Sequence, residues 1–381
     1  MPSDKPLRIV HCFRTPVGGV FRHVRDLIKA QSANGHDVGV ICDSTTGGDY
    51  ADKLFEEIKS DLSLGLQRIP MRRSITPGDI STVWKTYKKI KQLKPDVLHS
   101  HGAKGGAYAR IIGSLLRVSG IRVARLYCPH GGSIHFDAAS MKGKVFFGLE
   151  RLLNRMTDRL IFVSQYESDE FQKKVGKPSC ATSLIYNGLS PHEYLPVKAE
   201  KEGADFLYIG EMRDLKGPDV FLNAISKIKS MPDHTDIKAI FVGSGPDKSK
   251  YIEQIATLEL GDCVDVYEAM PAREAFAKAA IVVIPSLAES MPYIVLEAIA
   301  GHMPIVATRV GGVPEIFDGE PDAMCEPDNP DALAAQMLLV LNDKQRKAKA
   351  SKRSKKLAER FSVDVMANDV ETAYLKTLQS I

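Results

Sequence analysis

The sequence predicts an α/β protein built from two doubly wound parallel sheets. Short apolar runs alternate with stretches of helical periodicity almost throughout the 381 residues. Such alternation is typical of parallel sheets that are covered by helices on both faces. The expected strands are too numerous for one comfortable sheet, so we divide them between two. They lie at residues 7–13, 37–42, 96–100, 123–128, 159–163, 183–186, 206–209, 239–242, 264–267, 280–284, 304–308 and 323–325.

The chain length also suits two domains. The boundary is expected near 187–196, where an Asn-Gly turn and two prolines precede a polar tract. We therefore assign residues 1–188 to a first domain and residues 189–362 to a second. The last segment, 363–381, has one apolar face, so it must pack against another part of the protein.

Bulk composition is that of a soluble globular protein, with 44% hydrophobic and 26% charged residues. The formal charge of +4 is small for this length and gives no indication of nucleic-acid binding. The first residues lack the apolar stretch of a signal peptide, and no apolar run is long enough to span a bilayer. Six scattered cysteines show no paired or metal-type spacing. We expect reduced thiols in a cytoplasmic protein.

Two carboxylates flank the start of a short helix in the second domain. Glu289 follows the apolar run 280–285, and Glu297 lies about a turn and a half inside the next helix. Pro292 suits the first helical position, and Gly301 suits a left-handed stop. In an open α/β sheet, such a loop lies at the carboxyl ends of the strands, where ligands bind.

The backbone at this helix start favours an anion. The N–H groups of Met291, Tyr293 and Ile294 are expected to point at any anion placed there. Carboxylates beside an anion site favour a ligand with both phosphate and many hydroxyls, such as a nucleotide sugar.

A cationic loop follows the first strand of the second domain. It begins at Gly210 and carries Arg213 and Lys216. Arginine grips phosphate with two donors and lysine acts as a point charge, so together they can stabilise a pyrophosphate leaving group. Taken alone, the loop is equally well a solvated charged turn. Its combination with the two carboxylates favours the functional interpretation.

Several glycine turns and histidines follow other strands. Gly18-Gly19 and Gly243 offer close approach to backbone, although a glycine pair in such a loop is more often a simple turn. His130 follows a strand and precedes a glycine pair, so it either contacts a sugar or caps a turn. We interpret His99 and His101 as structural rather than metal-binding, since no Cys, Asp or Glu stands at ligand spacing.

The basic stretch 142–155 allows two interpretations. Its leucines at 149, 152 and 153 predict a core stripe, and its lysines and arginines are most simply a solvated helix face. The alternative is a peripheral contact with an anionic membrane, which the basic run 85–94 also favours.

Taken in order, these elements resemble the large retaining glycosyltransferase family four, whose fold is the GT-B architecture. The resemblance covers nearly the whole chain and rests on Gly18-Gly19, His130-Gly131, Asn187-Gly188, Gly210 to Gly217, Val242 to Gly245, Glu289-x7-Glu297 and Gly311 to Glu315. It implies two Rossmann-like domains facing a central cleft, with a C-terminal helix that crosses back to the first domain. It also implies transfer of a sugar from a nucleoside-diphosphate donor, held by the second domain, to an acceptor held by the first.

The resemblance further assigns roles to individual residues. Arg213 and Lys216 would hold the diphosphate, and Glu297 the ribose hydroxyls. Glu289 and His130 would contact the donor sugar. The remaining donor-binding positions are Gly18, Gly19, Gly210, Gly243, Ser290, Met291, Tyr293 and Ile294. The family's mechanism needs neither a metal nor a cofactor.

The sequence departs from the family pattern at two positions. Glu211 stands where the family usually has Arg, and we infer that Arg213 supplies the cation instead, because a carboxylate there would repel diphosphate. Ser190 stands where an Asp often ends the Asn-Gly seam.

The sequence thus predicts a retaining, metal-independent hexosyltransferase. A UDP-sugar is the favoured donor and GDP-mannose the next, and the acceptor is a polysaccharide or lipid-linked glycan, as in exopolysaccharide synthesis. The alternatives are a nucleotide-sugar epimerase or hydrolase and a non-catalytic nucleotide-sugar binding subunit, because a fold alone does not fix an activity.

Overall fold

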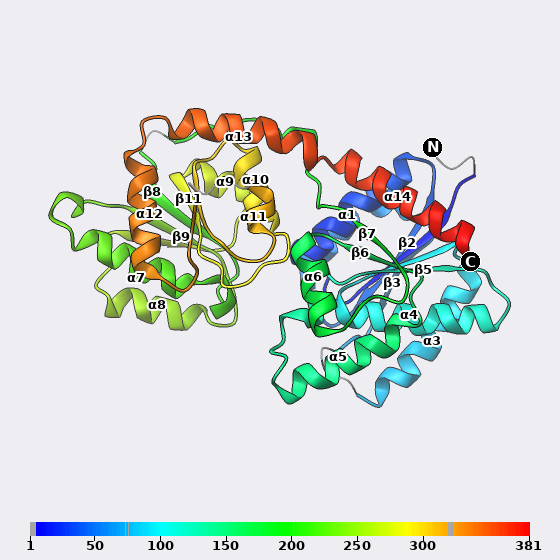
Figure 1. Ribbon diagram of the computed structural model, residues 1–381. Coiled ribbons are helices and arrows are strands. Elements are labelled where there is room, and N and C mark those ends of the chain that lie inside the picture. The colour runs from blue at the N-terminus through cyan, green and yellow to red at the C-terminus, as the bar shows by residue number, and fades with distance from the viewer. Residues whose placement is uncertain (1–4, 73, 75, 201, 319, 321–322) are drawn as a thin grey trace. The chain divides into compact units, whose positions relative to one another are not determined.

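The computed structural model describes residues 5–381 apart from 73, 75, 201, 319 and 321–322. The chain forms two compact units, which are coloured along the sequence in Figure 1. Unit 1 comprises Met1–Gly188 and Val363–Ile381, and unit 2 comprises Leu189–Ser362.

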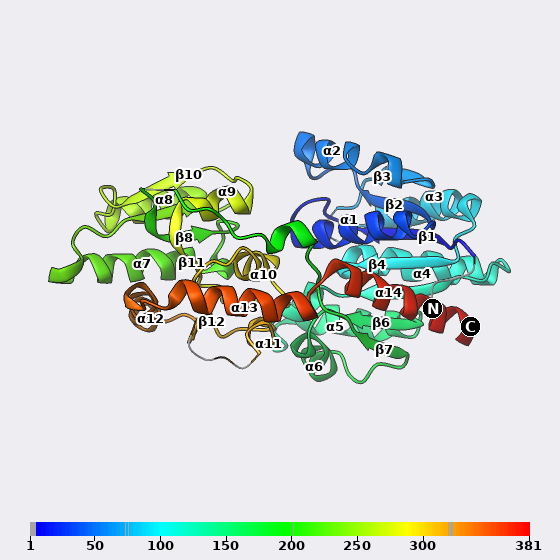
Figure 2. The ribbon, with the colours of Figure 1, turned by 90° about the horizontal axis from the view of Figure 1, so that it is seen from above.

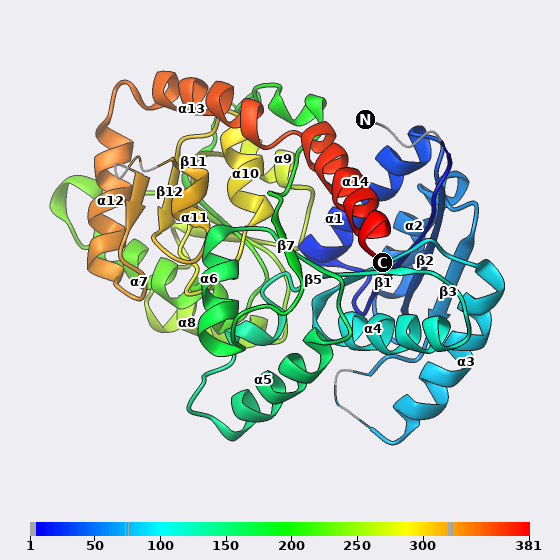
Figure 3. The same cartoon turned by 45° about the vertical axis from the view of Figure 1, so that its right-hand side comes forward.

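Unit 1 is built on a parallel sheet in which seven described strands pair in the order β3-β2-β1-β4-β5-β6-β7. These strands are β1 (Arg8–Phe13), β2 (Asp37–Asp43), β3 (Gly65–Ile69), β4 (Val97–His101), β5 (Ala124–Cys128), β6 (Arg159–Phe162) and β7 (Ala181–Leu184). Its helices are α1 (Gly18–Ala33), α2 (Gly48–Glu56), α3 (Gly78–Leu93), α4 (Gly102–Val118), α5 (Met141–Asn154), α6 (Gln165–Lys174) and α14 (Val363–Ser380). Helices α1 and α14 cover one face of the sheet, and α3 and α4 cover the other (Figures 1 and 3).

Unit 2 has a second parallel sheet, whose six described strands pair in the order β10-β9-β8-β11-β12-β13. The strands are β8 (Ala204–Ile209), β9 (Ala239–Val242), β10 (Val264–Tyr267), β11 (Ala279–Ile284), β12 (Ile305–Thr308) and β13 (Met324–Cys325). The helices are α7 (Pro218–Lys229), α8 (Lys248–Thr257), α9 (Ala272–Ala277), α10 (Tyr293–Ala300), α11 (Val313–Ile316), α12 (Pro330–Asn342) and α13 (Arg346–Arg360). Helices α7 and α8 lie on one face, and α9, α10 and α13 on the other (Figures 1 and 2).

The central strands are buried on both faces, as continuous apolar runs in a parallel sheet predict. In β11, five of six residues are buried, and β9 and β12 are buried throughout. The expected doubly wound α/β fold is therefore confirmed. The last helix, α14, packs on α1 and β5 of unit 1 and buries Met366, Val370 and Tyr374, so its apolar face is covered as expected.

One strand was missed by the sequence prediction. Strand β3 carries Gln67 and Arg68 in its centre and is only half-buried, because it lies at the edge of the unit 1 sheet. An edge strand exposes one side to solvent and so lacks the continuous apolar run that identifies a central strand. The strand expected at 183–186 also begins two residues earlier, at Ala181.

The ends of α10 differ from the prediction by one residue. Pro292 is the N-cap with extended backbone angles, and the helix begins at Tyr293. Gly301 is not left-handed, with φ −71°, and His302 adopts that conformation instead, with φ 61°. The His302 ring bonds Ser351 Oγ at 2.9 Å and the Tyr194 carbonyl at 3.2 Å. These contacts hold a non-glycine residue in the left-handed region, which normally favours glycine.

Among the described helices, none is long and apolar enough to cross a membrane.

Candidate functional site

The predicted carboxylate and cation of unit 2 meet beside the point where its strand order reverses. Strands β8 and β11 are neighbours, although β9 and β10 lie between them in the sequence. Ligands of doubly wound sheets bind at the carboxyl ends of strands at such a switch point. Lys216 follows β8, and its Nζ donates to Glu289 Oε1, after β11, at 2.5 Å.

This pair is shielded but reachable from solvent. The Glu289 side chain is 9% exposed and that of Lys216 is 28% exposed. Ser286 Oγ donates a second hydrogen bond to the same carboxylate oxygen at 2.8 Å. Glu289 is thus held in place by two donors, while part of the Lys216 side chain is exposed to solvent.

Two glycines let the loops of this edge touch one another. Gly217, with φ 65°, caps α7, and a Cβ on it would clash with the Pro285 carbonyl. Gly311, with φ 56°, lies so close to Glu289 that a Cβ would overlap the Glu289 carbonyl. Both positions require glycine for backbone angle and for space. The loop that carries Glu289 therefore takes the space beside Gly311.

Two glycines after β9 also pack closely against the backbone of a neighbouring loop, the one that follows β8. A Cβ on Gly243 would clash with the Gly210 carbonyl, and one on Gly245 with the backbone of Met212. The Met212 N–H donates to the Ser244 carbonyl at 2.9 Å, and its side chain is fully buried. The loop after β8 and the loop after β9 therefore pack against each other.

The unusual carboxylate at 211 is paired. Arg213 Nη1 lies 3.4 Å from Glu211 Oε2, and both side chains are well exposed, at 39% and 49%. Arg213 thus neutralises the neighbour that we expected to repel diphosphate. An ion pair this exposed is weak, so the guanidinium can exchange its partner.

The predicted sugar-binding residues surround the start of α10. Ser290, Met291 and Tyr293 are buried, and Ile294 and Glu297 are half-buried. Ser290 Oγ is buried without a hydrogen-bond partner among the residues that the structure describes. A buried hydroxyl of this kind costs free energy unless a ligand or water satisfies it, which is consistent with a polar ligand at this edge.

In unit 1, the predicted residues lie beside a second switch point, where β1 pairs with β4. Gly18 and Gly19 form the exposed first residues of α1, and Gly18 has φ 71° with open space around it. His130 follows β5, is half-buried and has a left-handed backbone, with φ 50°. The loop is held by the Gly131 N–H, which donates to the Glu167 carboxylate.

His130 is the outer end of a histidine cluster that the sequence did not reveal. His130 Nε2 lies 3.0 Å from His101 Nδ1, and His101 Nε2 lies 3.0 Å from His11 Nδ1. His23 packs edge-on against His130, with 4.7 Å between ring centroids. His99 lies 4.1 Å from His101 by the same measure. The sequence singles out His99, His101 and His130. It does not single out His11 on β1 or His23 on α1, because only the fold brings these two residues beside the others.

The cluster is electrically neutral. Burial lowers the pKa of His11 to about 4 and, with the nearby His11, that of His23 to about 3. Burial and the neighbouring imidazoles hold the pKa of His99, His101 and His130 well below the usual value. At neutral pH these rings act as hydrogen-bonding groups with free lone pairs rather than as cations.

Helix α5 corrects a second expectation. Its leucines do not form a core stripe, since Leu149 is 36% and Leu152 is 52% exposed. The helix instead buries Gly143, Phe147, Glu150 and Asn154. Glu150 can be buried because Arg110 on α4 donates to it twice at 3.0 Å, a partner that the local sequence does not show. Leu149 and Leu152 therefore face outward, whereas Leu153 is half-buried.

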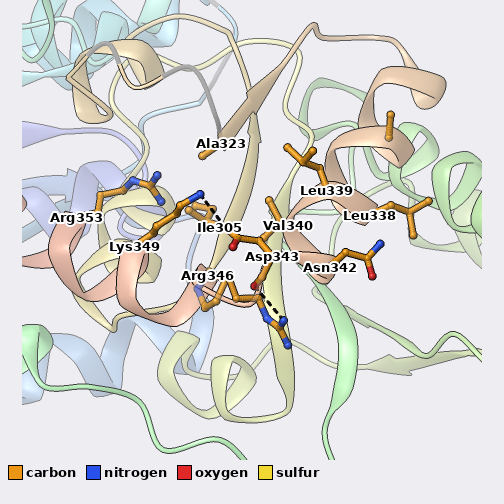
Figure 4. Close-up of a pocket in the computed structure, with 12 residues that line it drawn as sticks. Ile305, Ala323, Leu338, Leu339, Val340, Asn342, Asp343, Arg346, Lys349 and Arg353 are labelled. Atoms are coloured by element: carbon orange, nitrogen blue, oxygen red, sulfur yellow. Dashed lines mark hydrogen bonds and ion pairs between the residues drawn. The ribbon is translucent and has the colours of Figure 1, made fainter.

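A separate hollow of about 530 Å³ lies in unit 2 against α12 and α13. Three cations of α13 line it, as Figure 4 shows. Each already has a partner: Lys349 pairs with Asp343 at 2.9 Å, Arg353 with Glu320 at 3.2 Å, and Arg346 donates to the Leu341 carbonyl at 2.7 Å. It contains none of the predicted site residues.

Comparison with known proteins adds independent findings. The family model described as Glycosyltransferase Family 4 matches residues 17–193, and that described as Glycosyl transferases group 1 matches residues 203–343. The chain is 24% identical over 386 residues to glycogen synthase of Mycobacterium tuberculosis, covering 94% of this chain and 91% of that protein.

Two solved structures share the architecture. HepE of Anabaena, in complex with UDP and glucose, superposes with a TM-score of 0.79 at 19% identity and covers 98% of this chain and 100% of its own. WaaG, a glycosyltransferase involved in lipopolysaccharide biosynthesis, superposes with a TM-score of 0.71 at 15% identity and covers 96% and 99%. These likenesses establish the GT-B fold.

Proposed function

The chain belongs to glycosyltransferase family four, and from that premise we propose a retaining, metal-independent transfer of a hexose. The donor is a UDP-sugar in the first instance and GDP-mannose in the second. The acceptor is a polysaccharide or a lipid-linked glycan. Unit 2 holds the donor, and unit 1 holds the acceptor.

The observation that carries this proposal is the Lys216–Glu289 pair at the switch point of unit 2. An ammonium group there can stabilise the charge that develops on a leaving diphosphate. A carboxylate fixed by two donors can accept hydrogen bonds from sugar hydroxyls. The unpartnered Ser290 hydroxyl adds a further polar contact within the same loop. Arg213 and Glu297 complete the phosphate and ribose contacts.

The environment of Glu289 supports retention without a protein nucleophile. Its carboxylate accepts from Lys216 and Ser286, and in our proposal it orients the sugar and does not attack it. The leaving phosphate then takes the proton from the acceptor hydroxyl on the same face of the sugar. His130, as a neutral imidazole, donates to or accepts from a sugar hydroxyl.

Two measurements test the proposal. A thermal-shift panel of UDP, GDP, ADP and their sugars should show stabilisation by the cognate nucleotide, since a ligand that binds only the folded state raises its stability. Proton NMR of the product should show the donor's anomeric configuration retained. No shift with any nucleotide contradicts the assignment. Sugar release or isomerisation without acceptor supports a hydrolase or epimerase, and tight binding without turnover supports a binding subunit.

We further propose that α5 contacts an anionic membrane on the cytoplasmic side. Met141, Val145, Leu149 and Leu152 are exposed at helical spacing and form one outward stripe, hereafter the α5 stripe. Exposed basic residues flank it at 142, 144, 151 and 155. An apolar stripe bordered by cations is typical of helices that lie in the interface of a bilayer.

Vesicle sedimentation tests this contact. The protein should sediment with vesicles that contain phosphatidylglycerol and much less with pure phosphatidylcholine. The double substitution Val145→Gln and Leu152→Gln should reduce binding. Val118→Gln serves as the control, because Val118 is 87% exposed on α4 and lies outside the stripe. Equal binding by both variants would contradict the contact.

A further inference from the structure

The histidine cluster of unit 1 contains an arrangement that sugar transfer does not require. His23, His101 and His130 each offer a ring nitrogen, and these three nitrogens lie within 4.8 Å of one another. Among the ring nitrogens of these residues, His101 Nδ1 and His130 Nε2 are 3.0 Å apart. In a tetrahedral zinc site, two histidine nitrogens lie about 3.3 Å apart, so only small ring movements would bring the three around one ion.

Among the described residues, His23 Nε2 has no hydrogen-bond partner. His23 Nδ1 lies 3.1 Å from Asn187 Oδ1, which can only accept, so the proton sits on Nδ1 and Nε2 keeps its lone pair. His23 Nε2 is buried and has no hydrogen-bond partner within the described part of the chain. The His23 ring is 1% exposed. An acceptor buried in this way is expected to find a ligand.

The hydrogen bond of His101 to His11 likewise leaves His101 Nδ1 with a lone pair. His11 Nε2 donates to Gln31 Oε1 at 2.8 Å, which leaves His11 Nδ1 as an acceptor. His11 Nδ1 therefore accepts from His101 Nε2, and His101 Nδ1 keeps its lone pair. Histidine ligands of metal sites almost always donate their other ring N–H to such an outer partner. Here, Asn187 and His11 take that position.

From this geometry we infer that unit 1 binds a divalent transition-metal ion through His23 Nε2, His101 Nδ1 and His130 Nε2. Three neutral imidazoles suit Zn²⁺, Co²⁺, Ni²⁺ or Cu²⁺, whereas Mg²⁺ and Ca²⁺ require oxygen ligands. His130 is half-buried, so it provides the entry and leaves a fourth position for water. On binding, the His130 proton moves from Nε2 to Nδ1.

The ion is not part of the transfer step. If the proposed function is correct, His130 contacts a sugar hydroxyl, and an ion that fixes its ring inhibits transfer. The site therefore makes the enzyme sensitive to zinc. Binding itself requires only unit 1 and is measured without any sugar substrate, so it stands or fails separately from the proposed activity.

Cobalt titration of the full chain, stripped with a chelator, tests the site. One equivalent of Co²⁺ should give the visible absorption of a four-coordinate ion, which Zn²⁺ abolishes and Mg²⁺ does not. His23→Ala should lose the absorption. Asn187→Ala should weaken affinity roughly 10–100-fold, and Asn187→Asp should retain it, because a carboxylate accepts from the same Nδ1–H.

His192→Ala is the matched control, since His192 is exposed and lies in unit 2. Circular dichroism establishes that each variant is folded. The proposal is overturned if wild-type protein gives no cobalt absorption, if folded His23→Ala retains it, or if His192→Ala loses it. Zinc inhibition of transfer by wild-type protein, reduced in Asn187→Ala, is the expected consequence for activity.

Discussion

The sharpest test of the donor site is removal of the Lys216 charge. In the structure, Lys216 Nζ donates to Glu289 Oε1 at 2.5 Å and the Lys216 side chain is 28% exposed, so it can turn toward a diphosphate. A hydrogen bond to a charged group is worth about 1.5–3 kcal/mol. Taking about 2 kcal/mol, Lys216→Met should weaken UDP binding and lower kcat/KM by about thirtyfold.

The same substitution has a second effect that separates a binding role from a structural one. Without Lys216, the Ser286 hydroxyl is the one side-chain donor to Glu289 that remains among the described residues, and the Glu289 side chain is 9% exposed. Its unmet charge should destabilise the ligand-free protein by about 1–3 kcal/mol, which urea unfolding measures. Lys227→Met is the control, because Lys227 pairs with Asp331 at 2.7 Å elsewhere in unit 2.

Calorimetry with UDP and steady-state kinetics give the two readouts. Glu289→Gln should leave UDP affinity unchanged or raise it, since a negative charge beside the diphosphate is removed, yet it should lower kcat. If Lys216→Met destabilises the protein but leaves kcat/KM within about threefold of wild type, where a charged contact should cost about 2 kcal/mol, the lysine only anchors Glu289. The assignment to diphosphate is then wrong.

Three further predictions concern the scaffold. Glu150→Ala leaves the Arg110 guanidinium buried without its partner and should lower the free energy of unfolding by about 3–5 kcal/mol in urea titration. Gly311→Ala should displace the loop that carries Glu289, so kcat/KM should fall while a folded circular dichroism spectrum remains. Burial opposes ionisation of Asp79, but bonds from a lysine, a tyrosine and a backbone N–H outweigh it and lower its pKa. Its stabilising effect is therefore present above about pH 4 and is lost as pH falls through the lower folded-state pKa. Asp79→Asn should flatten the acid limb of unfolding free energy against pH.

The fold class could be predicted from the sequence because each buried strand of a parallel sheet is recognisable from its own residues. A strand buried on both faces must be apolar along its whole length, as β11 is. Strand β3 was missed because it lies at the edge of the unit 1 sheet and carries the polar residues Gln67 and Arg68. The helix stop at Gly301 failed for a different reason. Which residue takes the left-handed position was decided by the contacts of His302 with Ser351 and Tyr194, and these are distant in sequence.

The sequence predicted residues of the candidate site but not the contacts between them. Glu289 and Lys216 are 73 residues apart, and nothing in either loop says that they touch. Their contact follows from the strand order, in which β8 and β11 are neighbours. The same holds for His11 and His23, which belong to a strand and a helix without any motif. Spacing identifies residues within a loop, whereas sheet order decides which loops meet.

At Glu211, the structure adds a partner that the sequence does not show. From the sequence, a carboxylate at the expected position of an arginine is expected to repel diphosphate. In the structure, Glu211 pairs with Arg213, and the Arg213 N–H donates to the Glu211 carbonyl at 2.9 Å. The pair is exposed, so it contributes little to stability and its charges are partly screened by water. A diphosphate offers Arg213 two oxygens in place of one distant carboxylate, and guanidinium binds such an acceptor with two hydrogen bonds. Exchange of partners then costs little. Glu211 is therefore compatible with the proposed donor site, because its exposed ion pair with Arg213 is easily broken.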